Sequence, residues 1–180
     1  MSYGRSRNDY INAVIIPSFV QGKNFIATQV PLKETVGDFW SLVYDHDCRT
    51  LVVLDGKSLD YDADIRNVAM YVTDEWSCCT NISNTEKSVI DFIEMIYNDV
   101  GRNKSSVVVL CRDGCTRCGV FVALSLAMEQ IEIDKEVDIF QIARRIQTRR
   151  PQFLTNAEQY EFCYRCIKEY LRSESLYANM

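Results

Sequence analysis

The fold is indicated most directly by the stretch Val107-Val-Val-Leu-Cys111-Arg-Asp-Gly-Cys-Thr-Arg117-Cys-Gly119. Its first four residues, Val107–Leu110, form an apolar, largely β-branched run that is typical of a buried strand. The apolar segment Gly119–Gln130 that follows is predicted to be a helix. Between them lies a short connection with a cysteine, five further residues and an arginine. Such a connection is typical of α/β domains, whose ligand sites lie beyond the C-terminal ends of their strands.

The composition is that of one folded domain. The chain has 180 residues, of which 47% are apolar and 25% charged, so a sizeable core can form. The formal net charge of −5 argues against a general nucleic-acid binder, and no apolar run reaches the roughly 20 residues of a membrane span. We therefore expect no nucleic-acid partner and no membrane span in this chain. Arg144-Arg145 and Arg149-Arg150 are expected on a solvated face and at a loop entrance.

The chain has eight cysteines, at positions 48, 78, 79, 111, 115, 118, 163 and 166. The first nine residues contain no apolar run that could act as a secretory signal, so we expect a reducing, cytoplasmic compartment and free thiols. Two C-x-x-C pairs, Cys115 with Cys118 and Cys163 with Cys166, leave a structural zinc site as an alternative. The second pair lies in a predicted amphipathic helix, where core packing explains it more simply, so no metal ligand is assigned.

The remaining apolar patterns alternate between strands and helices. Strands are predicted at Asp9–Ile16, Asn24–Thr28, Thr50–Leu54 and Asn67–Thr73, and helices at Thr35–Tyr44 and Glu86–Val100, with two more helices closing the chain. The polar segments Asp55–Asp64 and Cys78–Asn84 are expected to be loops. This alternation predicts an α/β domain.

The connection after Leu110 has the groups needed to hold a phosphate. Backbone N–H groups of a loop that leads into a helix point at one spot, where the helix dipole adds positive charge. Arg117 can bind two phosphate oxygens, and Cys111 can lie beneath the phosphorus as a thiolate. The pattern predicts phosphoryl transfer to sulfur, with Cys111 and Arg117 as catalytic residues. The phosphate-binding loop would comprise Cys111, Arg112, Asp113, Gly114, Cys115, Thr116 and Arg117. The alternative is a buried cysteine and a surface arginine at a chance spacing.

A thiolate at Cys111 is also predicted to react with peroxide. A second thiol in or near the loop can capture the resulting sulfenic acid as a disulfide. Mild oxidation is therefore expected to link Cys111 to Cys115, Cys118 or Cys78.

Further segments extend the pattern over most of the chain. They are Asn8-Asp-Tyr-Ile-Asn-Ala13, Phe25-Ile-Ala-Thr-Gln-Val-Pro-Leu32, Thr35-Val-Gly-Asp-Phe-Trp40, Val137-Asp-Ile-Phe140, Arg150-Pro151 and Glu158-Gln-Tyr-Glu-Phe-Cys-Tyr164. Together with the Cys111–Arg117 loop, and in this order, they resemble the protein tyrosine phosphatase family, especially its receptor-type members. The resemblance implies a twisted mixed sheet flanked by helices, a phosphotyrosine pocket built around Cys111, and no cofactor.

The loop departs from the family pattern His-Cys-Ser-Ala-Gly-x-Gly-Arg-Ser/Thr-Gly. Leu110 replaces the histidine, Arg112-Asp113 replaces Ser-Ala, Thr116 replaces the second glycine, and Cys118 replaces the hydroxyl residue. Asp113 brings a carboxylate beside a site meant for a dianion, and Thr116 would be strained if its position required a positive φ. Loss of the hydroxyl at Cys118 should slow the breakdown of a phosphocysteine intermediate.

The general acid of the family is also replaced. Trp76-Ser77-Cys78 stands where the family has Trp-Pro-Asp, and a cysteine is a poor substitute for an acid whose proton transfer is worth about 10²–10⁴-fold. Asp74 and Glu75, just upstream, are the alternative acids. Thr155 aligns with the family glutamine that orients the hydrolytic water, whereas Gln159 matches the second glutamine of that segment.

The chain is shorter than the family pattern. The aromatic clamp for phosphotyrosine would precede Asn8, and several dozen residues are missing between Leu54 and Arg66, which is expected to remove strands and a loop that contacts the catalytic loop. Residues 1–180 are therefore expected to form one protein tyrosine phosphatase-like domain, truncated at the N-terminus and in the middle. It would be either a drastically trimmed variant or an incomplete gene product.

Substitutions of this kind resemble those of the second, membrane-distal domains of receptor-type members, and Cys111-Arg-Asp-Gly114 fits that subgroup. The resemblance implies a catalytically impaired domain that acts as a regulatory or phosphotyrosine/oxyanion-binding module. Its partner would be a phosphotyrosine protein or an adjacent phosphatase domain, and its location the cytoplasmic part of a membrane receptor. The alternative is a weakly active phosphatase that acts on phosphotyrosine through a phosphocysteine intermediate.

Overall fold

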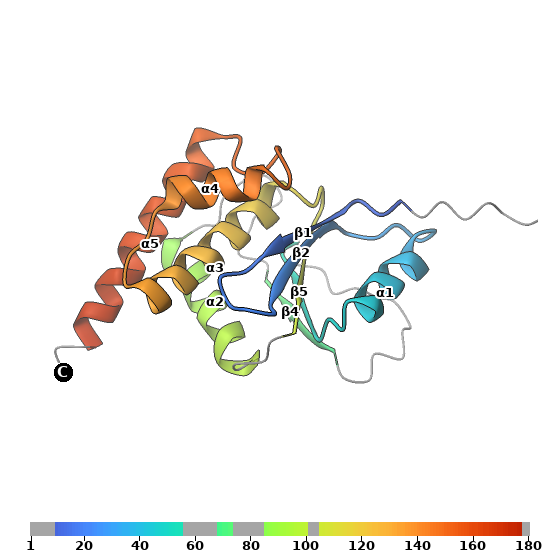
Figure 1. Cartoon of the computed structure of the whole chain (residues 1–180), viewed down its shortest axis with the longest axis horizontal. Coiled ribbons are helices and arrows are strands. Elements are labelled where there is room, and N and C mark those ends of the chain that lie inside the picture. Colours follow the sequence, from blue (N-terminus) through green and yellow to red (C-terminus); the bar gives the residue numbers. More distant parts are fainter. Residues whose placement is uncertain (1–9, 56–67, 74–84, 101–104, 178–180) are drawn as a thin grey trace, which may run out of the picture.

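A five-stranded mixed sheet with helices on both faces forms the centre of the computed structural model, which describes residues 10–55, 68–73, 85–100 and 105–177 (Figure 1). The strands are β1 Ala13–Pro17, β2 Asn24–Gln29, β3 Thr50–Val53, β4 Ala69–Val72 and β5 Val107–Cys111. Their order across the sheet is β1-β2-β5-β3-β4. Only the pair of β1 and β2 is antiparallel, and the other three pairs are parallel. The predicted α/β fold with a mixed sheet flanked by helices is confirmed.

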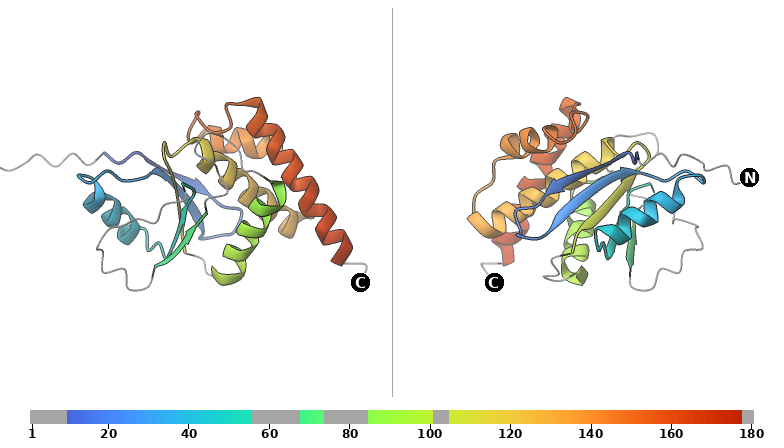
Figure 2. Two further views of the ribbon diagram at one scale, coloured as in Figure 1. Left: turned by 180° about the vertical axis from the view of Figure 1, so that it is seen from behind. Right: turned by 45° about the vertical axis from the view of Figure 1, so that its right-hand side comes forward.

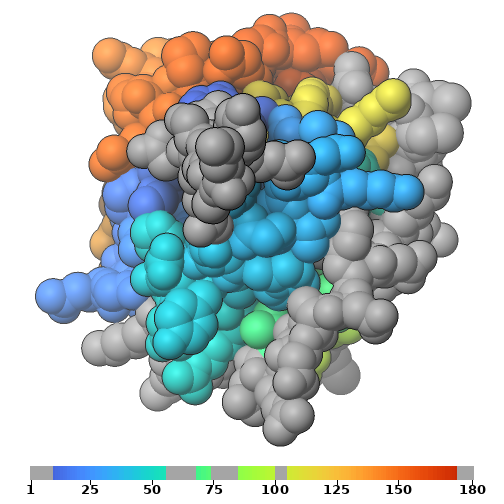
Figure 3. Space-filling view, turned by 90° about the vertical axis from the view of Figure 1, so that its right-hand side faces the viewer, coloured from blue at the N-terminus to red at the C-terminus, as the bar shows by residue number. Residues whose placement is uncertain are grey.

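The helices divide between the two faces of the sheet. They are α1 Val36–Asp45, α2 Glu86–Val100, α3 Thr116–Asp134, α4 Ile139–Gln147 and α5 Ala157–Tyr177. Figures 1 and 2 show α1 on one face and the other four helices gathered on the opposite face. The face that carries α1 is turned to the viewer in Figure 3, where α1 lies across the surface in blue to cyan. None of the helices in the described ranges combines the length and the apolar character needed to cross a membrane.

The central strand β5 sends alternate side chains to the two faces, because successive residues of a strand point in opposite directions. Val109 and Cys111 belong to the core cluster beneath α3, whereas Val108 and Leu110 pack in the second cluster, which contains Phe39 of α1. All five residues of β5 are buried. Cys111 therefore faces α3, and Leu110, at the position of the family histidine, is directed to the opposite side of the sheet.

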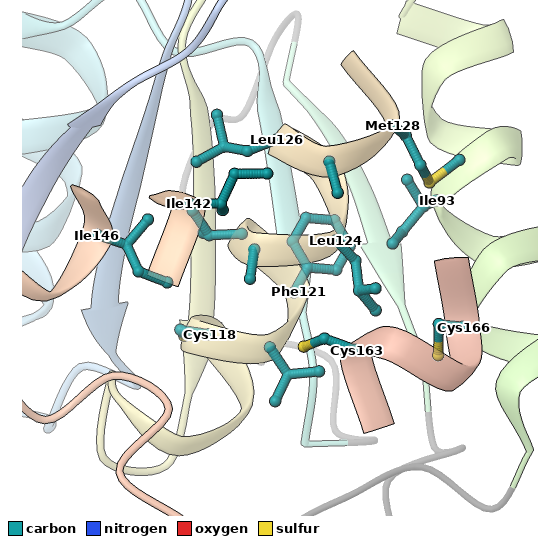
Figure 4. Packing of buried hydrophobic residues seen from close by; sticks show 14 of the residues in the cluster. Ile93, Cys118, Phe121, Leu124, Leu126, Met128, Ile142, Ile146, Cys163 and Cys166 are labelled. Atoms are coloured by element: carbon teal, nitrogen blue, oxygen red, sulfur yellow. The ribbon is translucent and has the colours of Figure 1, made fainter. Parts of the chain in front are cut away.

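Helix α3 is buried on nearly all sides, which explains its apolar sequence. Figure 4 shows Phe121, Leu124 and Met128 of α3 packed among side chains of α2, α4 and α5. One carboxylate, Glu129, lies in this core at 2% exposure and pairs with the Lys23 ammonium at 2.8 Å. The sequence pattern treats this stretch as purely apolar, so it misses the buried ion pair.

Most predicted elements are found, with shifted ends. Helix α2 has the predicted bounds, while β1 begins four residues later than predicted and β4 begins two residues later. Helix α3 starts at Thr116 rather than at Gly119. The Asp113 carboxylate accepts the N–H groups of Cys115 and Thr116, which would otherwise lack partners, so the helix begins one turn earlier. Residues 56–64 and 78–84 of the two predicted loops lie outside the described residues.

Candidate functional site

The Cys111–Arg117 loop leaves the sheet at the end where its parallel strands finish. Gln29 of β2 is paired with Cys111 of β5 in register, and both residues are the last of their strands. The Cys111 carbonyl accepts N–H groups from Val30 at 3.0 Å and from Gly114 at 3.2 Å. The first hydrogen bond extends the pairing of β2 with β5, and the second closes a tight turn that folds the loop back toward its own strand.

Two glycines of the loop region are closely packed, and space requires glycine at the first of them. Gly114 has φ +68°, and a Cβ there would lie 2.6 Å from the backbone nitrogen of Gln29 and 2.7 Å from the carbonyl carbon of Thr28. A Cβ on Gly119 would lie 3.0 Å from Cδ1 of Phe153. Both glycines match the family pattern, and here close packing against backbone or an aromatic ring explains each of them.

The Asp113 side chain turns back into its own loop. Its Oδ1 accepts the N–H groups of Cys115 at 2.8 Å and Thr116 at 2.9 Å and lies 3.2 Å from the Cys111 sulfur, while Oδ2 accepts the Thr116 hydroxyl. Partial burial alone would raise the pKa of Asp113. The hydrogen bonds from Thr116 and Cys115 outweigh burial and lower this pKa to about 2. The chain's own carboxylate thus binds N–H groups that the sequence assigned to a phosphate.

The Arg117 guanidinium also contacts a carboxylate of the chain. It donates to the Leu54 carbonyl at 3.1 Å and forms a salt bridge with Asp55, and both charged side chains are less than a fifth exposed. Burial raises the pKa of Asp55 even though Arg117 acts in the opposite direction. Asp55 is the residue at which the predicted polar loop begins, and no pattern of residues predicts its pairing with the arginine.

Thr116 is not strained at its position. It is the first residue of α3, and the positive-φ residues of the described part are elsewhere, with Gly114 the one in this loop. The condition under which Thr116 would be strained is therefore not met, because the helix begins early enough to give it a helical conformation.

Arg150 and Asn12 hold the loop from outside and were not predicted to do so. Arg150 is only 9% exposed, and its guanidinium donates to the Gly114 carbonyl and to Oδ1 of Asn12, each at 2.7 Å. It also lies 3.5 Å from the Cys115 sulfur. The sequence predicts a loop entrance for Arg149-Arg150, and the structure adds that the Arg150 side chain is buried there, whereas Arg149 is exposed. The sequence contained a reason to single out Asn12 and Arg150, because both residues lie in segments that resemble the family.

The cysteines of the loop differ in their surroundings. The Cys118 thiol lies 3.1 Å from the Cys111 sulfur, and this hydrogen bond lowers the pKa of Cys111 against the effects of burial and of Asp113. Burial raises the pKa of Cys118 well above its ordinary value and also raises that of Cys115. Cys111 is therefore the member of this group that ionises most readily.

Other predicted site residues make no hydrogen bond to the described loop or lie outside the described ranges. Thr155 is exposed, and Gln159 is buried in the first turn of α5 without a hydrogen bond to the described loop. Trp76-Ser77-Cys78 lies outside the described residues. Within the described ranges no group of three or more His, Cys, Asp or Glu side chains could hold a metal ion. Cys163 and Cys166, the second C-x-x-C pair, are buried on α5 (Figure 4).

Comparisons with known proteins identify the family that has this fold and the Cys111–Arg117 loop. The family model described as protein-tyrosine phosphatase matches residues 2–59 and 54–169, and the chain belongs to this family. Its relatives include receptor-type tyrosine-protein phosphatases F of Danio rerio and S of Gallus gallus, each 28% identical over 220 residues and 97% of this chain. Receptor-type tyrosine-protein phosphatase epsilon of Rattus norvegicus is 26% identical over 228 residues and 99% of this chain. The chain spans 12%, 14% and 32% of the lengths of these three relatives, respectively.

Proposed function

We propose that this chain is a catalytically impaired receptor-type tyrosine phosphatase domain that acts as a regulatory or phosphotyrosine/oxyanion-binding module. The observation that carries the proposal is the position of the Asp113 carboxylate, bound to the N–H groups of Cys115 and Thr116 and 3.2 Å from the Cys111 sulfur. The negatively charged Asp113 carboxylate thus accepts the N–H groups that a bound oxyanion would need, and it would repel that oxyanion.

Phosphoryl transfer would require two rearrangements of this geometry. A phosphate dianion over Cys111 needs the loop N–H groups, so the Asp113 carboxylate must first move away. Its negative charge would still repel the dianion at short range. Arg117 must also exchange its salt-bridge partner Asp55 for the phosphate oxygens. Each rearrangement lowers the affinity for phosphate, and neither supplies the proton that the family aspartic acid would donate.

The proposed domain is a single shortened one over residues 1–180. The family model matches in two segments that meet at residues 54–59, which supports a shortening between Leu54 and Arg66. We place the domain among membrane-distal domains on the sequence Cys111-Arg-Asp-Gly114. Its partner would be a phosphotyrosine protein or an adjacent phosphatase domain on the cytoplasmic side of a receptor, with Thr155, Gln159 and Trp76-Ser77-Cys78 as the remnants of the hydrolytic machinery.

A weakly active phosphatase is the second candidate, and one observation favours it. Cys111 is buried at the strand end with a pKa below its ordinary value, as a nucleophile requires. Its thiolate would attack phosphorus and the P–O bond to the phenol would break, leaving a phosphocysteine. With the family acid replaced, only a phenolate that leaves without a proton would depart readily.

Turnover of two substrates distinguishes these candidates. The chain is assayed with an activated aryl phosphate, whose phenolate is a good leaving group, and with a phosphotyrosine peptide. We expect no turnover, or turnover of the activated substrate alone that Cys111→Ser abolishes. Equal turnover of both substrates, dependent on Cys111, would contradict catalytic impairment. Turnover that survives Cys111→Ser would exclude the phosphocysteine route.

A further inference from the structure

A small cavity of about 20 Å³ lies where α2 and α3 meet the sheet. Most of its wall is apolar and includes Ile93 of α2 and Phe121 of α3, which Figure 4 shows in the core. The sheet contributes Phe25 and Val107, which are paired in register near the starts of β2 and β5. Cys111 is the last residue of β5, so the cavity lies at the opposite end of this strand from the Cys111–Arg117 loop.

Three polar side chains, Lys23, Tyr97 and Ser125, interrupt this apolar wall. Two of them have a partner, because the Glu129 carboxylate accepts the Lys23 ammonium and the Tyr97 hydroxyl, each at 2.8 Å. Ser125 is buried at 0% exposure, and its hydroxyl has no hydrogen-bond partner among the described residues. A buried hydroxyl that loses its hydrogen bonds to solvent and gains none in return destabilises the fold. Ser125 therefore calls for a partner that the chain itself does not supply.

We propose that this cavity binds one water molecule, which joins the Ser125 hydroxyl to the Tyr97 hydroxyl. A water molecule needs a cavity of at least about 10–15 Å³ and about two to four polar partners. The cavity is large enough, and the two hydroxyls, with the Lys23 ammonium beside them, supply the partners. Organic ligands are excluded by size, because their pockets measure about 300–1,000 Å³. The proposal is independent of the phosphatase function, because it needs no group of the Cys111–Arg117 loop.

The hydrogen bonds of the Tyr97 hydroxyl leave its oxygen able to accept. Its single proton is donated to the Glu129 carboxylate at 2.8 Å. Burial and this carboxylate raise the pKa of Tyr97 well above its ordinary value, so the proton is retained at neutral pH. The water therefore donates one hydrogen to the Tyr97 oxygen and accepts the hydrogen of the Ser125 hydroxyl. Because Tyr97 belongs to α2 and Ser125 to α3, the water forms a bridge between these two helices.

A second helical serine shows the partner that Ser125 lacks. A serine inside a helix can donate to the carbonyl four residues before it. Ser41 of α1 does so, with its hydroxyl 3.0 Å from the Gly37 carbonyl. Ser125 makes no such bond to the Phe121 carbonyl. The two serines thus share a place in a helix interior and differ in what the hydroxyl contacts, so Ser41 is the matched control.

Crystal structures of the full chain and of two variants test the proposal directly. We expect the wild type to show an ordered water about 2.5–3.0 Å from both the Ser125 and the Tyr97 hydroxyl oxygens. In Ser125→Ala this water should be absent, because one of its two hydroxyl partners is removed, whereas Ser41→Ala should keep it. An empty cavity in the wild type, a Ser125 hydroxyl bonded to the Phe121 carbonyl, or a water unmoved in Ser125→Ala would overturn the proposal.

The melting temperatures of the same two variants give a second readout, whose sign separates a hydrated cavity from a dry one. Alanine raises helix propensity over serine at both positions, so the difference between the variants reports on the buried hydroxyl. If the water is bound, Ser125→Ala loses a hydrogen bond and should melt about 2–4 °C below Ser41→Ala. If the hydroxyl has no partner, Ser125→Ala should melt at or above the temperature of Ser41→Ala, which would also overturn the proposal. The wild-type crystal structure decides the question even if a variant fails to fold.

Discussion

Replacing Asp113 with alanine should make the loop a stronger anion site and the fold less stable. Alanine is the residue of the family pattern at this position, so the change also removes a departure from that pattern. The lost interactions are the hydrogen bonds that the carboxylate accepts from Cys115, Thr116 and the Cys111 thiol. The two effects have opposite consequences and can be measured separately.

The stability loss follows from the helix end that Asp113 supports. Removing a side chain that accepts N–H groups at a helix start costs about 0.5–2 kcal/mol, and we expect about 1 kcal/mol here because Asp113 is exposed to solvent. For a chain of this size the melting temperature would fall by about 2–4 °C. Since the pKa of Asp113 is lowered from 3.8 to about 2, its stabilisation is present above pH 3.8 and is lost as the pH falls toward 2. The difference between wild type and variant should therefore shrink in that window.

The gain in anion affinity follows from the charge that is removed. Asp113 Oδ1 lies 3.2 Å from the Cys111 sulfur, so an oxyanion bound over this sulfur would be in contact range of the carboxylate. Two charges about 4 Å apart near a protein surface interact by about 4 kcal/mol before screening. Solvent exposure reduces this figure, and we expect about 1.4 kcal/mol, or about tenfold tighter binding.

The assay is the rise in melting temperature with tungstate at neutral pH. Asp113→Ala should show the larger rise, and adding Arg117→Ala should abolish it, because the bidentate contact to the anion is lost. Asp138→Ala is the matched control: Asp138 caps α4 through the Gln141 N–H, so it should lower stability without changing the response to tungstate. If Asp113→Ala binds tungstate no more tightly than the wild type, the carboxylate does not compete with oxyanions and the proposed impairment fails.

Three further substitutions test the supports of the loop and the core. Gly114→Ala forces a Cβ against the backbone at a positive φ and should lower the free energy of unfolding by about 3 kcal/mol in urea titrations; a loss below about 1 kcal/mol would contradict the packing argument. Arg150→Ala leaves the Gly114 carbonyl and Asn12 without their charged donor, and urea titration should show a loss of about 2–3 kcal/mol, whereas the exposed Arg149→Ala should change stability by less than about 0.5 kcal/mol. Glu129→Gln leaves the Lys23 ammonium buried without its carboxylate, so the melting temperature should fall by an amount equivalent to about 3 kcal/mol, and an unchanged value would show that Lys23 reaches water.

The sequence alone determined the elements whose side-chain pattern is local. The helix Glu86–Val100 was predicted with its observed bounds because one side of it is apolar at helical spacing. The strand before Cys111 was predicted from four consecutive apolar residues, and its burial on both faces explains why no polar residue alternates with them. The spacing of Cys111 and Arg117, with segments in the family order, was enough to indicate the family to which the chain belongs.

The contacts of the loop residues depend on the tertiary arrangement of the chain. The sequence predicts that the charge of Asp113 opposes a phosphate, because Asp113 lies only two residues from Cys111 along the chain. The sequence does not predict that this carboxylate accepts the loop N–H groups, because these hydrogen bonds depend on the turn at Gly114. The partner of Arg117 lies 62 residues away, and the Asn12 contact of Arg150 spans 138 residues. Hydrogen bonds over such separations depend on how the strands and helices are placed together, which no local pattern of residues specifies.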